Sequence, residues 1–205
     1  MRIRTLLLAL GAIAAAFLLW SREPASWTIR NAAPGDGPII CFGDSLTRGF
    51  GTAAEESYPA VLGRLLGREV LNRGRDGETA ESALERLEED VIALSPSVVI
   101  VTLGGNDMLR RVPIAVTVRS LRELFERTLA AGAMVVFVEI DPPFVGPERM
   151  DQVRGLSRAL GVLHLASVMD GLWGSPRLMS DRIHPSAAGY RLMAERVRDA
   201  LEARL

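Results

Sequence analysis

The chain has 205 residues, with 24 cationic and 25 acidic side chains and a formal net charge of −1 at pH 7. This length predicts one domain with a core large enough to be stable by itself, and the near-neutral charge excludes a basic footprint for nucleic acid. A single cysteine, Cys41, excludes an intrachain disulfide and a cysteine-rich metal site. Two histidines exclude a three-histidine zinc centre, so for a hydrolase we expect an organic nucleophile, no metal and no cofactor.

The first 20 residues are expected to lie outside the folded domain. Arg2 and Arg4 precede Thr5–Trp20, an apolar run of 16 residues without a charge, which is typical of an export signal or a signal anchor. As a helix this run would extend about 24 Å at 1.5 Å per residue, somewhat short of the ~30 Å hydrocarbon core of a bilayer. Trp20 at the membrane interface would make up part of the difference.

The cleavage of this segment stays an open alternative. Its A-x-A-like site, Ala14–Ala16, is embedded in apolar sequence, and Ala25 has Glu23 three positions before it, which suits a signal peptidase poorly. We therefore expect an uncleaved anchor in the inner membrane, in preference to a cleaved signal and a protein released into the periplasm. A buried core helix is the least favoured alternative. Both export hypotheses place the rest of the chain on the extracytoplasmic side.

A linker and then one domain, residues 38–205, are expected to follow. Ser21–Gly37 has the Pro, Gly and Ser content of a linker. Beyond it, short apolar runs without polar alternation indicate strands that are covered on both faces. The predicted strands are Pro38–Phe42, a weaker Glu69–Leu71, Ser97–Leu103, Met134–Ile140 and Val162–Leu165.

Helical patterns separate these strands. Between about Thr79 and Leu94, apolar residues recur at steps of three and four and form one face. The next helix begins at Pro113, where a missing N–H is tolerated, and ends at Gly132. Two more are predicted near Glu148–Leu160 and at about Ser186–Leu205. Strands interleaved with helices predict a doubly wound α/β fold with right-handed crossovers.

Compact polar motifs follow the predicted strands. They are GDSLT with Ser45, NRGRDGET with Gly77, GGND with Asn106, and DRIHP with Asp181 and His184. In a doubly wound sheet, ligands bind beyond the carboxyl ends of the strands, so these motifs are expected to meet at one edge.

The residue types in these motifs fit the cleavage of an ester. A serine hydroxyl is a poor nucleophile at neutral pH unless an adjacent base accepts its proton, and His184 is suited to that role because imidazole titrates near ~6.5. Asp181, three residues earlier, would hold the tautomer of the ring. The candidate donors to an oxyanion are the backbone N–H groups of Ser45 and Gly77 and the side-chain amide of Asn106.

These motifs, in this order, resemble the SGNH hydrolases, the GDSL esterase/lipase superfamily, from about residue 38 to the C-terminus. The resemblance implies a three-layer α/β/α sandwich with a five-stranded parallel sheet in the flavodoxin-like order 2-1-3-4-5. GDSLTRGFG, GGNDMLRR and SDRIHP look most like the small bacterial branch of acyl-CoA thioesterases, lysophospholipases and arylesterases. It also implies hydrolysis of a small acyl ester, a thioester or a lipid through an acyl-serine, with a narrow apolar trough for the acyl group.

Two alternatives to this function remain open. One is an O-acetylesterase acting on cell-envelope glycans, which would use the same triad. The other, from a different class, is a catalytically inactive, membrane-tethered binding protein. Separately, Arg73, Arg75 and Asp76 make the loop before Gly77 more charged than expected beside a lipid tail, which leaves the length of the acyl chain open.

Other candidate residues are expected to be structural. Cys41 and His164 lie within predicted strands and are interpreted as buried or edge residues. Asp44 and Asp107 are expected to order the turns beside Ser45 and Asn106. The pair Arg110-Arg111 is interpreted as part of a solvated loop, with the docking of an anionic group as the alternative.

Overall fold

The computed structural model describes residues 28–32, 34–142, 148–166, 168–202 and 204–205. Within these residues, five strands form a parallel sheet in the order β2-β1-β3-β4-β5. The strands are β1 Ile39–Gly43, β2 Val70–Gly74, β3 Val98–Thr102, β4 Met134–Val138 and β5 Leu163–Leu165. The predicted fold class and strand order are confirmed.

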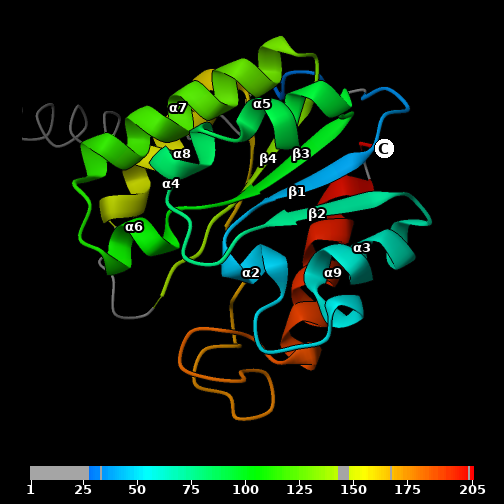
Figure 1. The fold of residues 1–205 in the computed structure, drawn as a ribbon, viewed down its shortest axis with the longest axis vertical. Coiled ribbons are helices and arrows are strands. Elements are labelled where there is room, and N and C mark those ends of the chain that lie inside the picture. Colours follow the sequence, from blue (N-terminus) through cyan, green and yellow to red (C-terminus); the bar gives the residue numbers. More distant parts are fainter. Residues whose placement is uncertain (1–27, 33, 143–147, 167, 203) are drawn as a thin grey trace, which may run out of the picture.

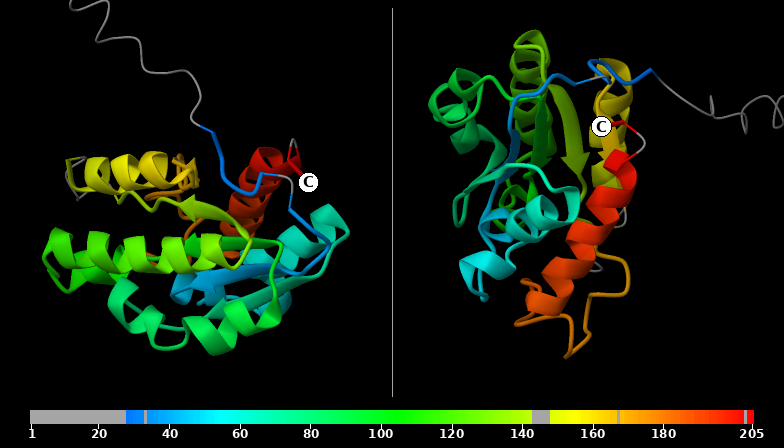
Figure 2. Two further views of the ribbon diagram at one scale, coloured as in Figure 1. Left: turned by 90° about the horizontal axis from the view of Figure 1, so that it is seen from above. Right: turned by 90° about the vertical axis from the view of Figure 1, so that its right-hand side faces the viewer.

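Helices cover both faces of the sheet (Figures 1 and 2). One face packs against α3 (Tyr58–Leu66) and α9 (Ala187–Glu202), which lie side by side. The other packs against α4 (Ala80–Leu84), α5 (Leu87–Asp90), α7 (Ile114–Ala130) and α8 (Glu148–Leu160). The shorter elements are α2 (Ser45–Arg48), η1 (Ala54–Glu56), η2 (Ile92–Leu94) and α6 (Gly105–Leu109).

The central strands are buried on both faces, as their unalternating apolar runs predict. In β1, Ile39 and Cys41 pack toward α3 and α9, whereas Ile40 and Phe42 pack toward the helices of the opposite face. All four side chains are fully buried. Burial raises the pKa of the Cys41 thiol to about 12, which fits its predicted role as a small buried side chain.

The helix predicted at residues 79–94 is wrong in its continuity, because the structure divides it into α4, α5 and η2. Arg86 separates the first two, with φ −114° and ψ 4°. Its buried guanidinium donates to the Glu78 carboxylate and to the carbonyl oxygens of Gly43 and Arg73. These bonds draw the chain toward the ends of β1 and β2.

The helix α3, which lies between β1 and β2 in the sequence, was not predicted.

The described part of the expected linker contacts the domain at the amino ends of the strands. The Arg30 N–H donates to the Gly161 carbonyl at 2.9 Å, and the Asn31 amide donates to the carbonyls of Leu129 and Ala133 at 3.1 and 2.8 Å. No helix among the described residues is long and apolar enough to cross a membrane. The predicted anchor, Thr5–Trp20, and its cleavage sites lie outside those residues.

Candidate active site

The five predicted site residues lie at the carboxyl edge of the sheet. Ser45 begins α2 directly after β1, Gly77 lies in the turn after β2, and Asn106 lies in the first turn of α6 after β3. Asp181 and His184 belong to the segment between β5 and α9, where a β-bridge joins residues 179 and 185. Because the strands are parallel, their carboxyl ends meet at this edge, and segments distant in sequence converge there.

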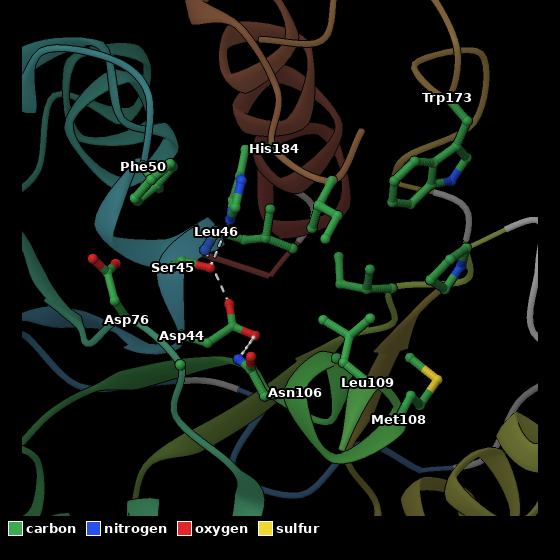
Figure 3. A pocket seen from close by; sticks show the side chains of 15 residues that line it. Asp44, Ser45, Leu46, Phe50, Asp76, Asn106, Met108, Leu109, Trp173 and His184 are labelled. Atoms are coloured by element: carbon green, nitrogen blue, oxygen red, sulfur yellow. Dashed lines mark hydrogen bonds between the residues drawn. The ribbon is translucent and has the colours of Figure 1, made fainter. Parts of the chain in front are cut away.

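Ser45, His184 and Asp181 form a continuous hydrogen-bonded array, of which Figure 3 shows Ser45 and His184. The Ser45 Oγ lies 3.0 Å from His184 Nε2, and His184 Nδ1 lies 2.7 Å from Asp181 Oδ2. The other carboxylate oxygen of Asp181 accepts the backbone N–H groups of Ile183 and His184, both at 2.7 Å. This is the geometry that a serine nucleophile, a base and an orienting carboxylate require.

The contacts around this array keep Asp181 ionised and the imidazole ring in place. Burial raises the pKa of Asp181, but the hydrogen bonds from His184 and from the Ile183 N–H outweigh it and hold that pKa below its usual value. Phe50 packs on the His184 ring with centroids 4.4 Å apart, and its carbonyl accepts the Tyr190 hydroxyl at 3.1 Å.

The nucleophile turn is packed too closely to the sheet for side chains at its glycines. A Cβ at Gly43 would lie 2.4 Å from the Thr102 carbonyl oxygen, and one at Gly74 would lie 2.1 Å from the Arg48 nitrogen. Asp44 caps α2 by accepting the Leu46 N–H at 2.9 Å. Its predicted role in ordering this turn is confirmed.

Two hydrogen bonds hold the Asn106 amide beside the nucleophile turn. Its nitrogen donates to the Glu78 carbonyl at 3.0 Å and to Asp44 Oδ2 at 3.2 Å. The contact between Asp44 and Asn106 was not predicted, because it joins residues 62 positions apart. Asp107, beside Asn106, accepts the Ala80 N–H and the Thr117 hydroxyl, both at 3.0 Å, and so orders this segment as predicted.

Asp44 is a buried carboxyl group that, within the described part of the chain, accepts the Leu46 N–H and the Asn106 amide and forms no ion pair. Burial raises its pKa, the neighbouring Glu78 and Asp107 raise it further, and the Leu46 N–H partly opposes them, which leaves a pKa of about 7. Glu78 itself forms a buried ion pair with Arg86. The pocket therefore contains a carboxyl group that is partly protonated near neutral pH.

A cavity of about 260 Å³ opens beside Ser45. Figure 3 shows Ser45 between His184 and Asp44, with Phe50 and Leu109 on opposite sides of the pocket. The remaining wall is mostly apolar and includes Leu46, Met108, Ile140, Pro142, Trp173 and Ile183. Phe50 and Leu109 are 40% and 51% exposed, so the mouth of the cavity is apolar as well.

The remaining candidates lie apart from Ser45. His164 is nearly buried and lies 2.6 Å from the Glu139 carboxylate, which fits its interpretation as a core histidine. Arg110 and Arg111 are exposed, as expected of a solvated loop, and the Arg110 guanidinium also donates to the Gly77 carbonyl at 2.7 Å. Across the described ranges, no group of three or more His, Cys, Asp or Glu side chains is arranged to hold a metal ion.

Comparisons with known proteins agree with this geometry. The model of the GDSL-like lipase/acylhydrolase family matches residues 41–192. The chain is 27% identical to the esterase TesA of Pseudomonas aeruginosa over 78% of this chain and 85% of that protein. It is 28% identical to thioesterase 1/protease 1/lysophospholipase L1 of Escherichia coli K12, over 77% and 79% of the two chains. The crystal structure of TesA superimposes with a TM-score of 0.76 at 26% identity, covering 82% of this chain and 99% of that one.

Proposed function

Because the chain belongs to the GDSL-like lipase/acylhydrolase family and is a carboxylic ester hydrolase, we propose that it cleaves acyl esters or thioesters through an acyl-serine intermediate. Ser45 is the nucleophile, His184 the general base and Asp181 the orienting carboxylate. The observation that carries this assignment is the array of 3.0 and 2.7 Å contacts from Ser45 Oγ through the His184 ring to Asp181.

The array supports two successive acyl transfers. Asp181 accepts a hydrogen bond from the Nδ1–H of His184, which leaves the lone pair of Nε2 free to take the proton of Ser45 as its Oγ bonds to the carbonyl carbon. Nε2 then returns that proton to the leaving alcohol or thiol as the ester or thioester bond breaks. In the second half, His184 takes a proton from water, the hydroxide attacks the acyl-serine, and the carboxylic acid leaves as Ser45 recovers its proton.

Each attack turns the carbonyl oxygen into an oxyanion that needs preformed donors. We assign this role to the N–H groups of Ser45 and Gly77 and to the side-chain amide of Asn106. In the free enzyme the Asn106 nitrogen donates to the Asp44 carboxylate at 3.2 Å. The amide therefore gives up only a long hydrogen bond when it donates to the oxyanion instead. The loss of one such donor typically lowers turnover by about 10²–10³, or ~3 kcal/mol.

The apolar cavity is the proposed site of the acyl group. The cavity has a volume of about 260 Å³ and a mostly apolar wall, which suits an acyl chain of intermediate length. Rates on p-nitrophenyl esters from acetate to palmitate are therefore expected to peak between those extremes. A maximum at acetate would favour the O-acetylesterase alternative.

Covalent labelling tests the proposed nucleophile directly. A fluorophosphonate probe is expected to label the full-length protein once, and Ser45→Ala is expected to remove the label. A label that persists in Ser45→Ala contradicts the assignment. A wild-type protein that takes no label and hydrolyses no ester of the series would support the inactive binding protein instead.

We further propose that Thr5–Trp20 tethers the enzyme to the inner membrane with its domain on the periplasmic side. The linker reaches the domain near Arg30 and Asn31, at the amino ends of the strands, whereas the cavity opens at their carboxyl ends. A tethered enzyme would thus present its pocket away from the bilayer. The protein is expected to resist carbonate extraction from membranes and to keep its first 20 residues by mass spectrometry. A soluble product beginning near Phe17 or Ser26 would identify a cleaved signal.

A further inference from the structure

The Gly77 donor lies at the most easily reoriented peptide of a tight turn. The turn joins Arg75 to Glu78, whose N–H donates to the Arg75 carbonyl at 3.3 Å, and Gly77 occupies its third position with φ +72°. The peptide between Asp76 and Gly77 carries the N–H proposed to face the oxyanion. Glycine accepts either sign of φ, so this peptide can rotate while both ends of the turn stay in place.

An arginine from the Asn106 segment contacts the carbonyl group that follows that peptide. Arg110 follows α6, four residues after Asn106, and its Nη2 donates to the Gly77 carbonyl at 2.7 Å. A Cβ added to Gly77 would lie 3.1 Å from this nitrogen. The guanidinium therefore lies directly against the glycine.

An arginine from the Ser45 segment contacts the Asp76 side chain, which precedes that peptide. Arg48 is the last residue of α2, three residues after Ser45, and its Nε lies 2.5 Å from Asp76 Oδ1. Its guanidinium also lies 5.4 Å from the centre of the Phe50 ring, which limits its rotation. The two segments that carry the other oxyanion donors thus each contribute one arginine to the Gly77 turn.

We propose that Arg48 and Arg110 are positioning residues that hold the Asp76–Gly77 peptide with its N–H toward the oxyanion. The inference rests on the proposed function, because it concerns the oxyanion site of that reaction. The arginines bind the protein backbone and a carboxylate of the turn, not the substrate. They fix one donor relative to the other two, and such alignment accelerates a reaction without strengthening the binding of the ground state.

Substrate docking is the competing role for these arginines, and kinetics separate the two. An arginine that binds an anionic substrate group changes KM, and only for anionic substrates. An arginine that orients the Gly77 N–H changes kcat for every ester, including neutral p-nitrophenyl esters.

The test compares full-length Arg48→Ala and Arg110→Ala with Arg119→Ala. Arg119 pairs with Glu81 at 3.2 Å, also between separate elements and on the surface, but outside the turn. We expect Arg48→Ala and Arg110→Ala each to lower kcat on a neutral ester about tenfold with KM unchanged. This is less than the 10²–10³-fold loss expected when a donor is removed, because the Gly77 N–H is still present. The rate of phosphonate labelling should fall in parallel, Arg110→Lys should recover part of the loss, and Arg119→Ala should match the wild type.

The Gly77 amide gives a second readout that does not depend on turnover. Its ¹⁵N relaxation should gain an exchange contribution in Arg110→Ala that is absent from the wild type and from Arg119→Ala. The inference would be overturned if Arg48→Ala and Arg110→Ala left both kcat and the ¹⁵N relaxation of Gly77 unchanged. An effect confined to KM would overturn it as well. If the wild type hydrolyses no ester, the proposed function fails, and the Gly77 amide alone then decides whether the arginines hold the peptide.

Discussion

The sequence contains two histidines, and each lies between a serine and a carboxylate. His184 lies 3.0 Å from Ser45 and 2.7 Å from Asp181, and His164 lies 3.1 Å from Ser157 and 2.6 Å from Glu139. The Ser157 hydroxyl also donates to the Val153 carbonyl at 3.0 Å, so its proton is engaged by the backbone.

The two arrays differ in access and in charge compensation. Ser157 and Glu139 are fully buried and do not line the cavity, and Arg154 donates to the Glu139 carboxylate at 2.9 Å. The array at Ser45 borders an apolar cavity and lies beside the uncompensated carboxyl of Asp44. A serine, a histidine and an acid in contact therefore also occur where no cavity gives access to the serine. In the proposed mechanism, the array at Ser45 differs from this buried cluster by its open space, its oxyanion donors and its charge arrangement.

The largest expected effect comes from replacing the serine or the histidine of the array at the cavity. Ser45→Ala and His184→Ala should each lower kcat by about 10⁶, and the double variant should be hardly worse, because the residues act as a unit. Ser157→Ala is the matched control and should keep kcat within a factor of two or so, since its hydroxyl is closed off from the cavity. Steady-state kinetics on the preferred p-nitrophenyl ester measure all four proteins. A comparable loss in Ser157→Ala would mean that the second array takes part in the reaction.

The second largest effect concerns the proposed oxyanion donors. The His164 array has no such donors among its described contacts. Asn106→Ala should lower kcat by about 10²–10³ with little change in KM if the amide serves only the transition state. Asn31→Ala is a control with the same chemistry, because the Asn31 amide also bonds backbone carbonyls, at the opposite end of the sheet. A loss in Asn106→Ala that is confined to KM would indicate a role in ground-state binding.

A third prediction concerns Glu139, the buried carboxylate whose charge Arg154 compensates. Burial raises the pKa of Glu139, but the hydrogen bonds from His164 and Arg154 outweigh it and lower that pKa. The pair therefore stabilises the fold above the pKa of the unfolded glutamate, and this contribution is lost as the pH falls through the lower folded value. Glu139→Gln should cost about 3 kcal/mol at pH 7, less in acid, and should leave kcat unchanged. Urea unfolding at pH 7 and at pH 3 measures the difference, and an equal loss at both pH values would contradict the ionic origin.

Much of this site could be predicted because its reactive groups lie within short motifs. Ser45, Asn106 and His184 are each adjacent to residues that set their local turn, and the buried strands are continuous apolar runs. The contacts that support the site could not be predicted in the same way. Arg110 bonds a backbone carbonyl 33 residues away, and a backbone acceptor leaves no pattern in sequence.

The broken helix shows the same limit. Apolar spacing at residues 79–94 is nearly periodic, so the sequence predicts one continuous helix, and nothing in that spacing indicates a buried role for Arg86. Its side chain is instead 7% exposed and bonds Glu78 together with the ends of β1 and β2. A tertiary ion pair therefore overrides local helical preference, and only the folded arrangement reveals it.

The smallest expected effect tests the uncompensated carboxyl of Asp44. A pKa raised from 3.8 to about 7 means that the unfolded state gives up this proton more readily than the folded state. Stability from this group is therefore complete below about pH 4 and is lost as the pH rises through about 7, at a cost of about 4 kcal/mol at most. Asp44→Asn removes the buried charge and can still accept the Leu46 N–H, but its amide faces the Asn106 amide, at a cost of about 1–3 kcal/mol. We expect the variant to gain about 2 kcal/mol in unfolding free energy at pH 8, to lose about 1–2 kcal/mol at pH 4, where Asp44 is largely protonated, and to lose activity because the Asn106 amide is displaced. Urea unfolding between pH 4 and pH 8 measures this effect. If the change in unfolding free energy did not depend on pH, Asp44 would not be the group whose ionisation destabilises the fold.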